Sequence, residues 1–171
     1  MKKHVAILQF PGTNCEYDTQ YAFEHLGATT TIVWHQETAL PSNTDLVVVP
    51  GGFSYGDYLR SGAIARFAPI MNAVSTYAQQ GGRVLGICNG FQILVEAGLL
   101  PRALKRNKYL HFISSFHTLR VENNDNLFLS HLQVGDVVSI PIAHADGSYF
   151  VTDEEYKALS SNGQILLTYC D

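Results

Sequence analysis

One cysteine in this chain has the surroundings of a nucleophile. Cys88 lies in the segment Gly-Ile-Cys-Asn-Gly at 86–90, between an apolar run at 83–85 and a stretch of helical periodicity at 91–97. A tight turn from strand to helix points the sulfur away from the backbone, and flanking glycines permit that bend. The first turn of the helix offers free N–H groups and a positive dipole end, which favour the thiolate. The sequence therefore favours a reactive thiol at Cys88 over the commoner alternative, a buried structural cysteine.

A pair of glycines offers this thiol a second chemical group. The loop Pro50-Gly51-Gly52 follows another apolar run, and glycines let backbone N–H groups come close to a ligand. We expect the N–H groups of Gly52 and Asn89 to form an oxyanion hole when Cys88 attacks a carbonyl carbon. The alternative interpretation of the two glycines is an ordinary turn.

A serine competes with Cys88 for the role of nucleophile. Ser54 lies in Gly-Phe-Ser-Tyr-Gly at 52–56, which matches the G-x-S-x-G pattern of serine hydrolases. Residues 57–62 lack a clear helix start, whereas Cys88 leads directly into an apolar-periodic helix. The context favours Cys88 and indicates that Ser54 is a loop residue whose hydroxyl binds the local backbone.

Short apolar runs and helical segments alternate through the first half of the chain. A capping-box pattern at 13–16 starts the first helix, with Tyr17, Tyr21, Ala22 and Leu26 at helical spacing. Strands are predicted over 5–10, 29–34, 45–49 and 84–87, and further helices over 63–80 and from Cys88 to near Gly98. The alternation predicts a doubly wound, mostly parallel α/β sheet of the flavodoxin-like kind, with Cys88 and the Gly51-Gly52 loop at the carboxyl edge.

The second half of the chain has a different texture. After Pro101, strands are predicted over 112–121, 136–142, 147–152 and 164–169, joined by short polar turns. No repeat, low-complexity tract or linker divides the sequence. We therefore expect a single domain over 1–171 with a β-rich C-terminal half.

Composition narrows the classes of partner and compartment. With 15% charged residues, a net charge of -4 and a pI near 5.9, the chain has no broad attraction for nucleic acid or anionic membranes. Pro11 interrupts the N-terminal apolar stretch too early for a signal peptide, and no run could span a bilayer. Cys15, Cys88 and Cys170 lack metal-ligand spacing, so we expect reduced thiols, no metal site and a cytoplasmic protein.

Four segments of the sequence resemble a known family. Residues 11–15, 50–60, 86–92 and 141–144 are similar to the glutaminase subunits of phosphoribosylformylglycinamidine synthases, which are class I glutamine amidotransferases of purine biosynthesis. The turn at Cys88 is shared by the whole superfamily, whereas the segment 53–60 is far more specific. The resemblance extends along the entire chain.

The resemblance implies a reaction and a partner. It implies that Cys88 attacks the side-chain amide of glutamine, forms a γ-glutamyl thioester and releases ammonia. Gln92 matches a position that contacts glutamine, although by itself it reads as an exposed helix residue. The ammonia would pass to a synthetase subunit that uses ATP and Mg, possibly with a small accessory subunit. This chain itself is expected to hold no cofactor, and it has no GxxxxGK[ST] motif.

One expected motif is missing from the sequence. The family carries its catalytic His and Glu in a Pro-His-Pro-Glu segment near the C-terminus, and this sequence contains none. We therefore expect a chain truncated at its C-terminus, with an unpaired sheet edge and a rate lowered by orders of magnitude. One alternative is an inactive scaffold that binds the synthetase. Another is a different α/β-fold Cys hydrolase with His144 as base and Asp146 as its orienting group.

A further segment has more than one interpretation. Phe53, Tyr55 and Tyr58 form an aromatic loop that could dock a partner, act as a lid or pack on the core. Arg60 and Arg66 are candidates for a salt bridge to the synthetase or for surface solvation.

Overall fold

The computed structural model describes residues 2–170, and its backbone contacts form two compact units. The first unit extends to Leu104 and the second begins at Lys105. The expectation of a single domain over the whole chain stays a prediction.

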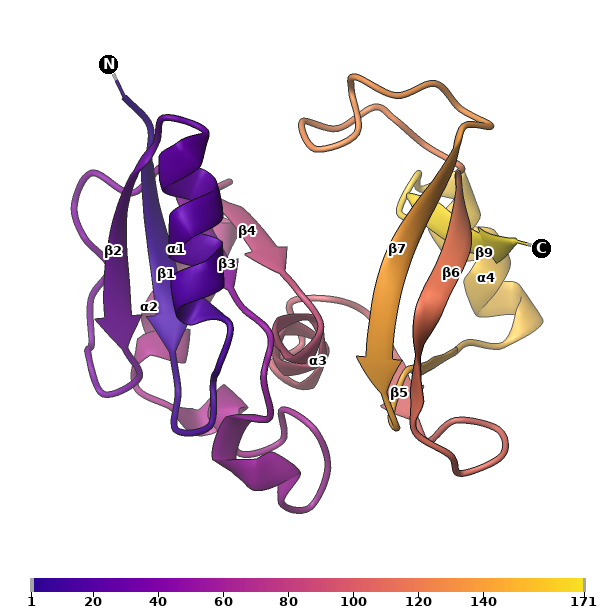
Figure 1. Cartoon of the computed structure of the whole chain (residues 1–171), viewed down its shortest axis with the longest axis horizontal. Coiled ribbons are helices and arrows are strands. Elements are labelled where there is room, and N and C mark those ends of the chain that lie inside the picture. Colours follow the sequence, from indigo (N-terminus) through magenta and orange to yellow (C-terminus); the bar gives the residue numbers. More distant parts are fainter. Residues whose placement is uncertain (1, 171) are drawn as a thin grey trace. The chain divides into compact units, whose positions relative to one another are not determined.

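The first unit is built on a four-stranded parallel sheet (Figure 1). Its strands are β1 (His4–Gln9), β2 (Thr29–Trp34), β3 (Leu46–Val49) and β4 (Arg83–Gly86), in the order β2-β1-β3-β4. In the register, Val5 pairs with Thr30 on one side and with Leu46 on the other. The predicted parallel sheet is therefore confirmed. At most of the strand ends, the predicted and the observed bounds differ by one residue.

Helices cover both faces of this sheet. They are α1 (Glu16–His25), α2 (Ile70–Gln79) and α3 (Asn89–Glu96), with the 3-10 turns η1 (Ser54–Asp57) and η2 (Ala65–Phe67). In Figure 1, α1 lies in front of the sheet and α2 behind it. Ala6 and Leu8 belong to the hydrophobic cluster that includes α2 and α3, whereas Val5 and Ile7 pack on the side of Phe23 in α1. Because both faces are covered, β1 is an unbroken apolar run.

Two helix predictions need correction. The cap residue of α1 is Cys15, without a side-chain cap, because the Thr13 hydroxyl instead accepts a hydrogen bond from the N–H of Phe10 at 3.0 Å. Tyr17 and Tyr21 point into solvent. The helix predicted over 63–80 is interrupted before Pro69, since a residue that precedes proline favours the extended conformation that Ala68 adopts.

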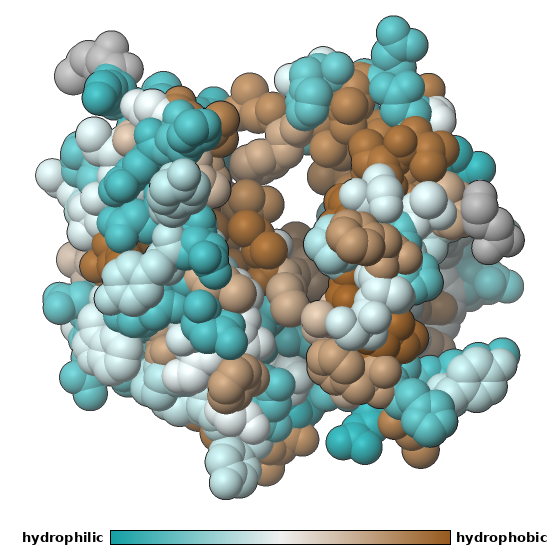
Figure 2. Space-filling view, viewed as in Figure 1, coloured by the Kyte–Doolittle hydropathy of each residue, from teal (hydrophilic) through white to brown (hydrophobic). Residues whose placement is uncertain are grey.

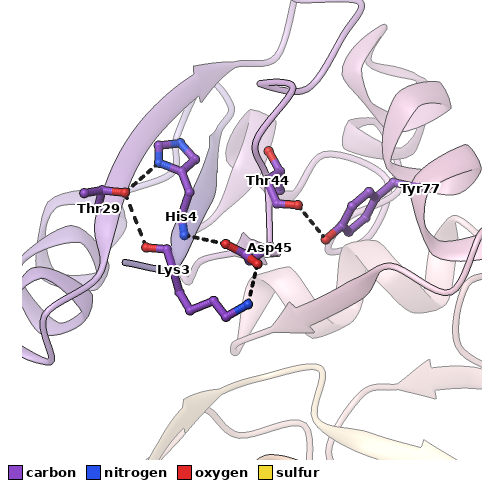
Figure 3. A network of polar contacts seen from close by, with 6 residues as sticks. All are labelled: Lys3, His4, Thr29, Thr44, Asp45 and Tyr77. Carbon is purple, nitrogen blue, oxygen red and sulfur yellow. Dashed lines mark hydrogen bonds and ion pairs between the residues drawn. The ribbon is translucent and has the colours of Figure 1, made fainter. Parts of the chain in front are cut away.

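A polar network secures the amino-terminal edge of the sheet (Figure 3). The Asp45 carboxylate accepts hydrogen bonds from Lys3 Nζ at 2.7 Å and from the His4 N–H at 2.9 Å. The His4 ring in turn contacts the Thr29 hydroxyl at 2.9 Å. The hydrogen bond from Lys3, followed by that from His4, lowers the pKa of Asp45. The network joins the start of β1 to β2 and to the residue before β3, at the edge opposite Cys88.

The second unit confirms the predicted β-rich half. Strands β6 (Ile113–Val121), β7 (Val137–His144) and β9 (Leu167–Cys170) form an antiparallel sheet in the order β7-β6-β9. The short strand β8 (Ser148–Phe150) follows β7, and β5 (Ala103–Lys105) spans the boundary between the units. Within residues 2–170, no helix is both long and apolar enough to cross a membrane.

One helix, α4 (Asp153–Ser161), was not predicted from the sequence. Its start carries a complete capping box: the Thr152 hydroxyl accepts from the Glu155 N–H at 3.3 Å, and the Glu155 carboxylate accepts from the Thr152 N–H at 2.8 Å. The pattern Thr-Asp-Glu-Glu at 152–155 was therefore a readable signal.

Candidate active site

Cys88 occupies a strained turn between β4 and α3. Its backbone has φ 53° and ψ -113°, a conformation that non-glycine residues rarely adopt, and its side chain is exposed. The Ile87 N–H donates to the Val49 carbonyl at 2.9 Å, and the Gly90 N–H donates to Ile87 at 2.8 Å, which closes the turn. The predicted strand-to-helix turn is confirmed. Strain of this kind gathers at functional sites because the surrounding structure has to maintain it.

The turn fits because Gly90 has no side chain. A Cβ atom on Gly90 would lie 1.8 Å from the Val49 carbonyl oxygen, far inside contact distance. The first turn of α3 can therefore approach the end of β3 directly, where β3 and β4 pair in parallel with Val49 opposite Gly86. The loop that follows β3 is thereby set beside Cys88.

The double-glycine loop lies against the cysteine. A Cβ atom built on Gly51 would be 3.4 Å from both the Cβ of Cys88 and the Sγ of Cys15. Gly52 has φ +148°, and a Cβ there would meet the Gly12 carbonyl oxygen at 2.8 Å. Only glycine fits at position 52, which agrees with the predicted close approach of the backbone in this loop.

Both N–H groups proposed for the oxyanion hole are available. Among residues 2–170, neither the Gly52 N–H nor the Asn89 N–H donates a hydrogen bond to a protein acceptor. Asn89 is the first residue of α3, where the N–H groups have no partner within the helix. The oxyanion role of the two residues stays a prediction, and these free donors support it.

Cys15 was not predicted to belong to this site. Its sulfur, like the Cβ of Cys88, would lie 3.4 Å from a Cβ atom built on Gly51, and it donates to the Asn14 side-chain oxygen at 3.3 Å. Burial, followed by the nearby Asp18 and Cys88, raises the pKa of the Cys15 thiol. Cys15 therefore remains protonated at neutral pH. A usable signal was its place just after the carboxyl end of β1, next to β3 in the sheet.

A buried amide network connects the turn to the loop before it. Asn89 is 1% exposed, and its side chain accepts from the Ser54 N–H at 3.0 Å and donates to the Gln92 side-chain oxygen at 2.9 Å. Gln92 is itself buried, so the interpretation as an exposed helix residue is wrong, while its contact with glutamine stays a prediction. Sequence analysis assigned a role to the Asn89 backbone and none to its side chain.

Ser54 is not placed to act as a nucleophile. The residue is 2% exposed, and its hydroxyl is buried without a hydrogen-bond partner among the described residues. The expectation that this hydroxyl binds the local backbone is therefore wrong. Its low rank as a nucleophile agrees with its burial, because a substrate carbonyl cannot reach it.

The aromatic loop divides between core and surface. The Tyr55 hydroxyl lies 2.8 Å from His35 Nδ1, and its ring packs against the main hydrophobic cluster. Phe53 and Tyr58 are exposed. Core packing is thus the correct interpretation for Tyr55, and the docking or lid role stays a prediction for the other two.

Arg60 has a partner within its own unit. Its guanidinium makes two hydrogen bonds to the Glu96 carboxylate, at 2.5 and 2.7 Å. Arg66 donates to the Glu96 carbonyl oxygen at 3.2 Å. The ion pair joins the segment after η1 to the end of α3. This contact within the unit was not among the predicted roles of Arg60, which were a salt bridge to the synthetase and surface solvation.

No histidine of the first unit stands beside Cys88 in the described structure. His4 lies at the opposite edge of the sheet, and His25 ends α1 at that same edge. His35 follows β2, which is three strands from β4, or about 14 Å at the usual strand spacing. Among residues 2–170, no group of three or more metal-ligating side chains occurs.

His144 organises a turn in the second unit. Its Nδ1 lies 3.1 Å from the side-chain oxygen of Asn107, and that buried amide also donates to the His144 carbonyl at 2.9 Å. Burial lowers the pKa of His144, so the ring is neutral at neutral pH. Asp146 lies 3.6 Å from the Arg106 guanidinium. The alternative in which His144 is a catalytic base stays a prediction.

A parallel α/β sheet with an exposed cysteine at a strand-to-helix turn indicates a particular class of protein. Comparison with known proteins identifies that class. The chain belongs to the glutamine amidotransferases: residues 2–171 match the family described as "CobB/CobQ-like glutamine amidotransferase domain". Several curated relatives share one name, phosphoribosylformylglycinamidine synthase subunit PurQ. That of Sulfurimonas denitrificans is 64% identical over 98% of this chain and 75% of its own length, and that of Wolinella succinogenes is 62% identical over 96% and 76%.

One solved structure supports the same assignment, and a second has the same fold. The structure titled PurLQS from Thermotoga maritima matches with a TM-score of 0.90 at 38% identity, over 100% of this chain and 76% of that one. A glutamine amidotransferase from Thermotoga maritima matches with a TM-score of 0.61 at 18% identity, over 85% of this chain and 62% of that one, and shows the fold alone.

Proposed function

We propose that this chain is a glutaminase subunit that releases ammonia from glutamine for the synthesis of formylglycinamidine ribonucleotide in purine biosynthesis. The observation that carries the proposal is the exposed Cys88 on its strained turn, against the double-glycine loop. The similarity to PurQ subunits along almost the entire chain supports the proposed substrate and pathway.

The proposed reaction begins with attack of the Cys88 sulfur on the side-chain carbonyl carbon of glutamine. A carbon–sulfur bond forms, and the carbonyl electron pair moves onto oxygen, where the N–H groups of Gly52 and Asn89 stabilise the charge. Collapse of this intermediate breaks the carbon–nitrogen bond, and the leaving nitrogen takes the proton that the Cys88 thiol gave up, which yields ammonia. Water then hydrolyses the γ-glutamyl thioester, which releases glutamate and the Cys88 thiol.

The ammonia requires a consumer. We propose a complex with a synthetase subunit that uses ATP and Mg, in keeping with the likeness to PurLQS from Thermotoga maritima, and with a small accessory subunit. On this proposal the present chain binds glutamine and contributes no cofactor of its own.

The proposal is tested by covalent labelling with a chloroketone analogue of glutamine, followed by peptide mapping. We expect one adduct, on Cys88, with protection by excess glutamine. Cys88→Ser should abolish the adduct, and Cys15→Ser should retain it because the Cys15 thiol is protonated. Labelling of Cys15 or Cys170 in preference to Cys88 would contradict the mechanism.

A further inference from the structure

The buried side chain of Asn89 connects the two parts of the proposed oxyanion hole. Its oxygen accepts from the Ser54 N–H at 3.0 Å, and its nitrogen donates to the Asp57 carboxylate at 3.3 Å and to the Gln92 side chain at 2.9 Å. At 1% exposure, an amide that lost these partners would carry a large desolvation penalty. The chain therefore holds this polar group inside the protein only because three partners satisfy it.

The loop that Asn89 holds is strained. Tyr55 has φ 53° and Asp57 has φ 54°, both in the left-handed region that non-glycine residues disfavour. Residues in such a conformation persist where the surrounding contacts hold the backbone in place. The Phe53 N–H donates to Gly12 at 3.0 Å, and the Tyr55 N–H donates to Pro11 at 2.6 Å. These contacts tie the loop to the segment after β1, and Asn89 ties it to the helix that follows the nucleophile.

This arrangement gives one residue influence over both donors. The Asn89 N–H adjoins Cys88, and the Asn89 side chain fixes Ser54, which lies two residues after Gly52. The hydrogen bond from Ser54 to Asn89 is therefore one of the contacts that hold the loop after Gly52 in place relative to the N–H beside Cys88. A displacement of about 1 Å in such a site can lower a rate on the order of 100-fold.

We propose that the side chain of Asn89 is a positioning residue that sets the spacing of the two oxyanion N–H donors. This inference rests on the proposed function, since it concerns the same attack on a carbonyl carbon. It concerns the side chain of Asn89, which does not itself touch the reacting atoms.

The test compares two probes of Cys88 in the complete chain. The p-nitrophenyl γ-ester of glutamate reacts by sulfur addition to the carbonyl carbon; the oxyanion forms, and its collapse expels p-nitrophenolate, which needs no proton to leave. Iodoacetamide reacts by direct displacement of iodide and forms no oxyanion. We expect Asn89→Ala to lower the p-nitrophenolate burst rate roughly 10- to 100-fold, and to change the iodoacetamide rate by less than about threefold, because thiol access and ionisation are retained.

A matched control exists in the second unit. Asn107 is also a buried asparagine, 7% exposed, whose side chain bonds to His111, His144 and Gly147. Asn107→Ala should leave both rates unchanged despite a loss of stability. A fall of equal size with both probes in Asn89→Ala, or no fall with the ester, would overturn the inference.

A second variant keeps the test decisive if Asn89→Ala does not fold. Asn89→Asp has nearly the same volume and retains the acceptor for Ser54, but faces the Asp57 carboxylate with a second one. The ratio of the ester rate to the iodoacetamide rate should be low at about pH 8 and should rise at about pH 5, where the two carboxylates share a proton. A ratio independent of pH would contradict the inference. A wild-type chain without a burst, or a burst that survives Cys88→Ser, would instead refute the proposed function.

Discussion

The two units of this molecule bury their apolar side chains to very different extents. In the first unit, the centres of β1 and β3 are completely inaccessible, with Ala6, Ile7 and Val48 at 0% exposure. In the described part of the second unit, the buried hydrophobic residues are Val121 and Leu159. Figure 2 shows the same contrast, since the visible face around α1 is mainly hydrophilic while hydrophobic residues gather on the surface of the second unit.

The second unit relies more on side-chain amides that bind turn backbones. Asn107 bonds to the carbonyl of His144, and Asn123 and Asn124 donate to the carbonyls of Gly163 and Leu132. A hydrogen bond of this kind contributes about 1 kcal/mol, whereas a fully buried leucine contributes several times more. The candidate site therefore lies on the unit with the denser core.

The largest effect is expected from Gly90→Ala. Because the new Cβ would lie 1.8 Å from the Val49 carbonyl oxygen, the contact of α3 with β3 must open, at a cost of about 3 kcal/mol or more. Trp34, the single tryptophan, reports on the first unit, so urea unfolding followed by its fluorescence measures the loss. Gly27→Ala is the control: open space surrounds Gly27, and its φ of +88° should cost only about 1–2 kcal/mol. Equal losses would show that crowding at the turn is unimportant.

The next prediction tests the contrast between the two cores. Leu8→Ala removes a side chain at 0% exposure and should cost about 2–5 kcal/mol. Leu159→Ala, at 6% exposure on α4 in the sparser unit, should fall at the lower end of that range. Hydrogen exchange read by peptide should show faster exchange throughout the first unit for Leu8→Ala, and only beyond residue 104 for Leu159→Ala. A larger loss for Leu159→Ala would reverse the comparison.

A smaller effect is expected at the start of α4. Thr152→Ala removes the hydroxyl that accepts from the Glu155 N–H and should cost about 1 kcal/mol. Amide exchange over 153–161 is the measurement, and exchange in the first unit should not change. Ser160→Ala, at an exposed position near the other end of the helix, should leave the exchange of α4 as it is. Similar exchange in both variants would contradict the role of the capping box.

The smallest effect is a pH dependence shared by both units. Hydrogen bonds from Lys3 and His4 lower the pKa of Asp45, and those from Thr168 and Arg120 lower the pKa of Glu122. Each folded pKa lies below its unfolded value, so each carboxylate stabilises the fold above about pH 4 and loses that contribution as pH falls through the folded pKa.

The measurement compares urea midpoints of the wild type with those of Asp45→Asn and Glu122→Gln. Each substitution should lower the midpoint at pH 7, and the difference from wild type should shrink as pH falls below about 4. Glu37→Gln, at an exposed carboxylate, should show no difference at any pH. A difference that grows in acid would show that the sign is wrong.

Most of the first unit could be predicted because local pattern and tertiary burial agree there. The apolar runs of β1 and β3 and the glycines around Cys88 indicated both the parallel sheet and the turn. The start of α1 was mispredicted because Thr13 binds backward to Phe10, a choice that depends on how the loop meets Gly52. Such long-range competition is not visible in a four-residue motif.

The sequence predicted the candidate nucleophile of the site but not the contacts that support it. Cys88 was identified from its neighbours in sequence, whereas the Cys15 sulfur and the Asn89 side chain reach the site through contacts with residues 35 or more positions away. The helix α4 had a readable start that the sequence analysis did not use. The change of texture noted after Pro101 lies close to the boundary between the two compact units at residue 104.

The closeness of Gly90 to Val49 has a consequence for ligands. Backbone also approaches closely at Gly52, where an added Cβ would meet the Gly12 carbonyl oxygen at 2.8 Å. A side chain added at Gly90 or Gly52 would collide with the backbone of a neighbouring segment, and a change of rotamer could not relieve that collision. Variants designed to bind a different ligand beside Cys88 should therefore keep both glycines and change other positions.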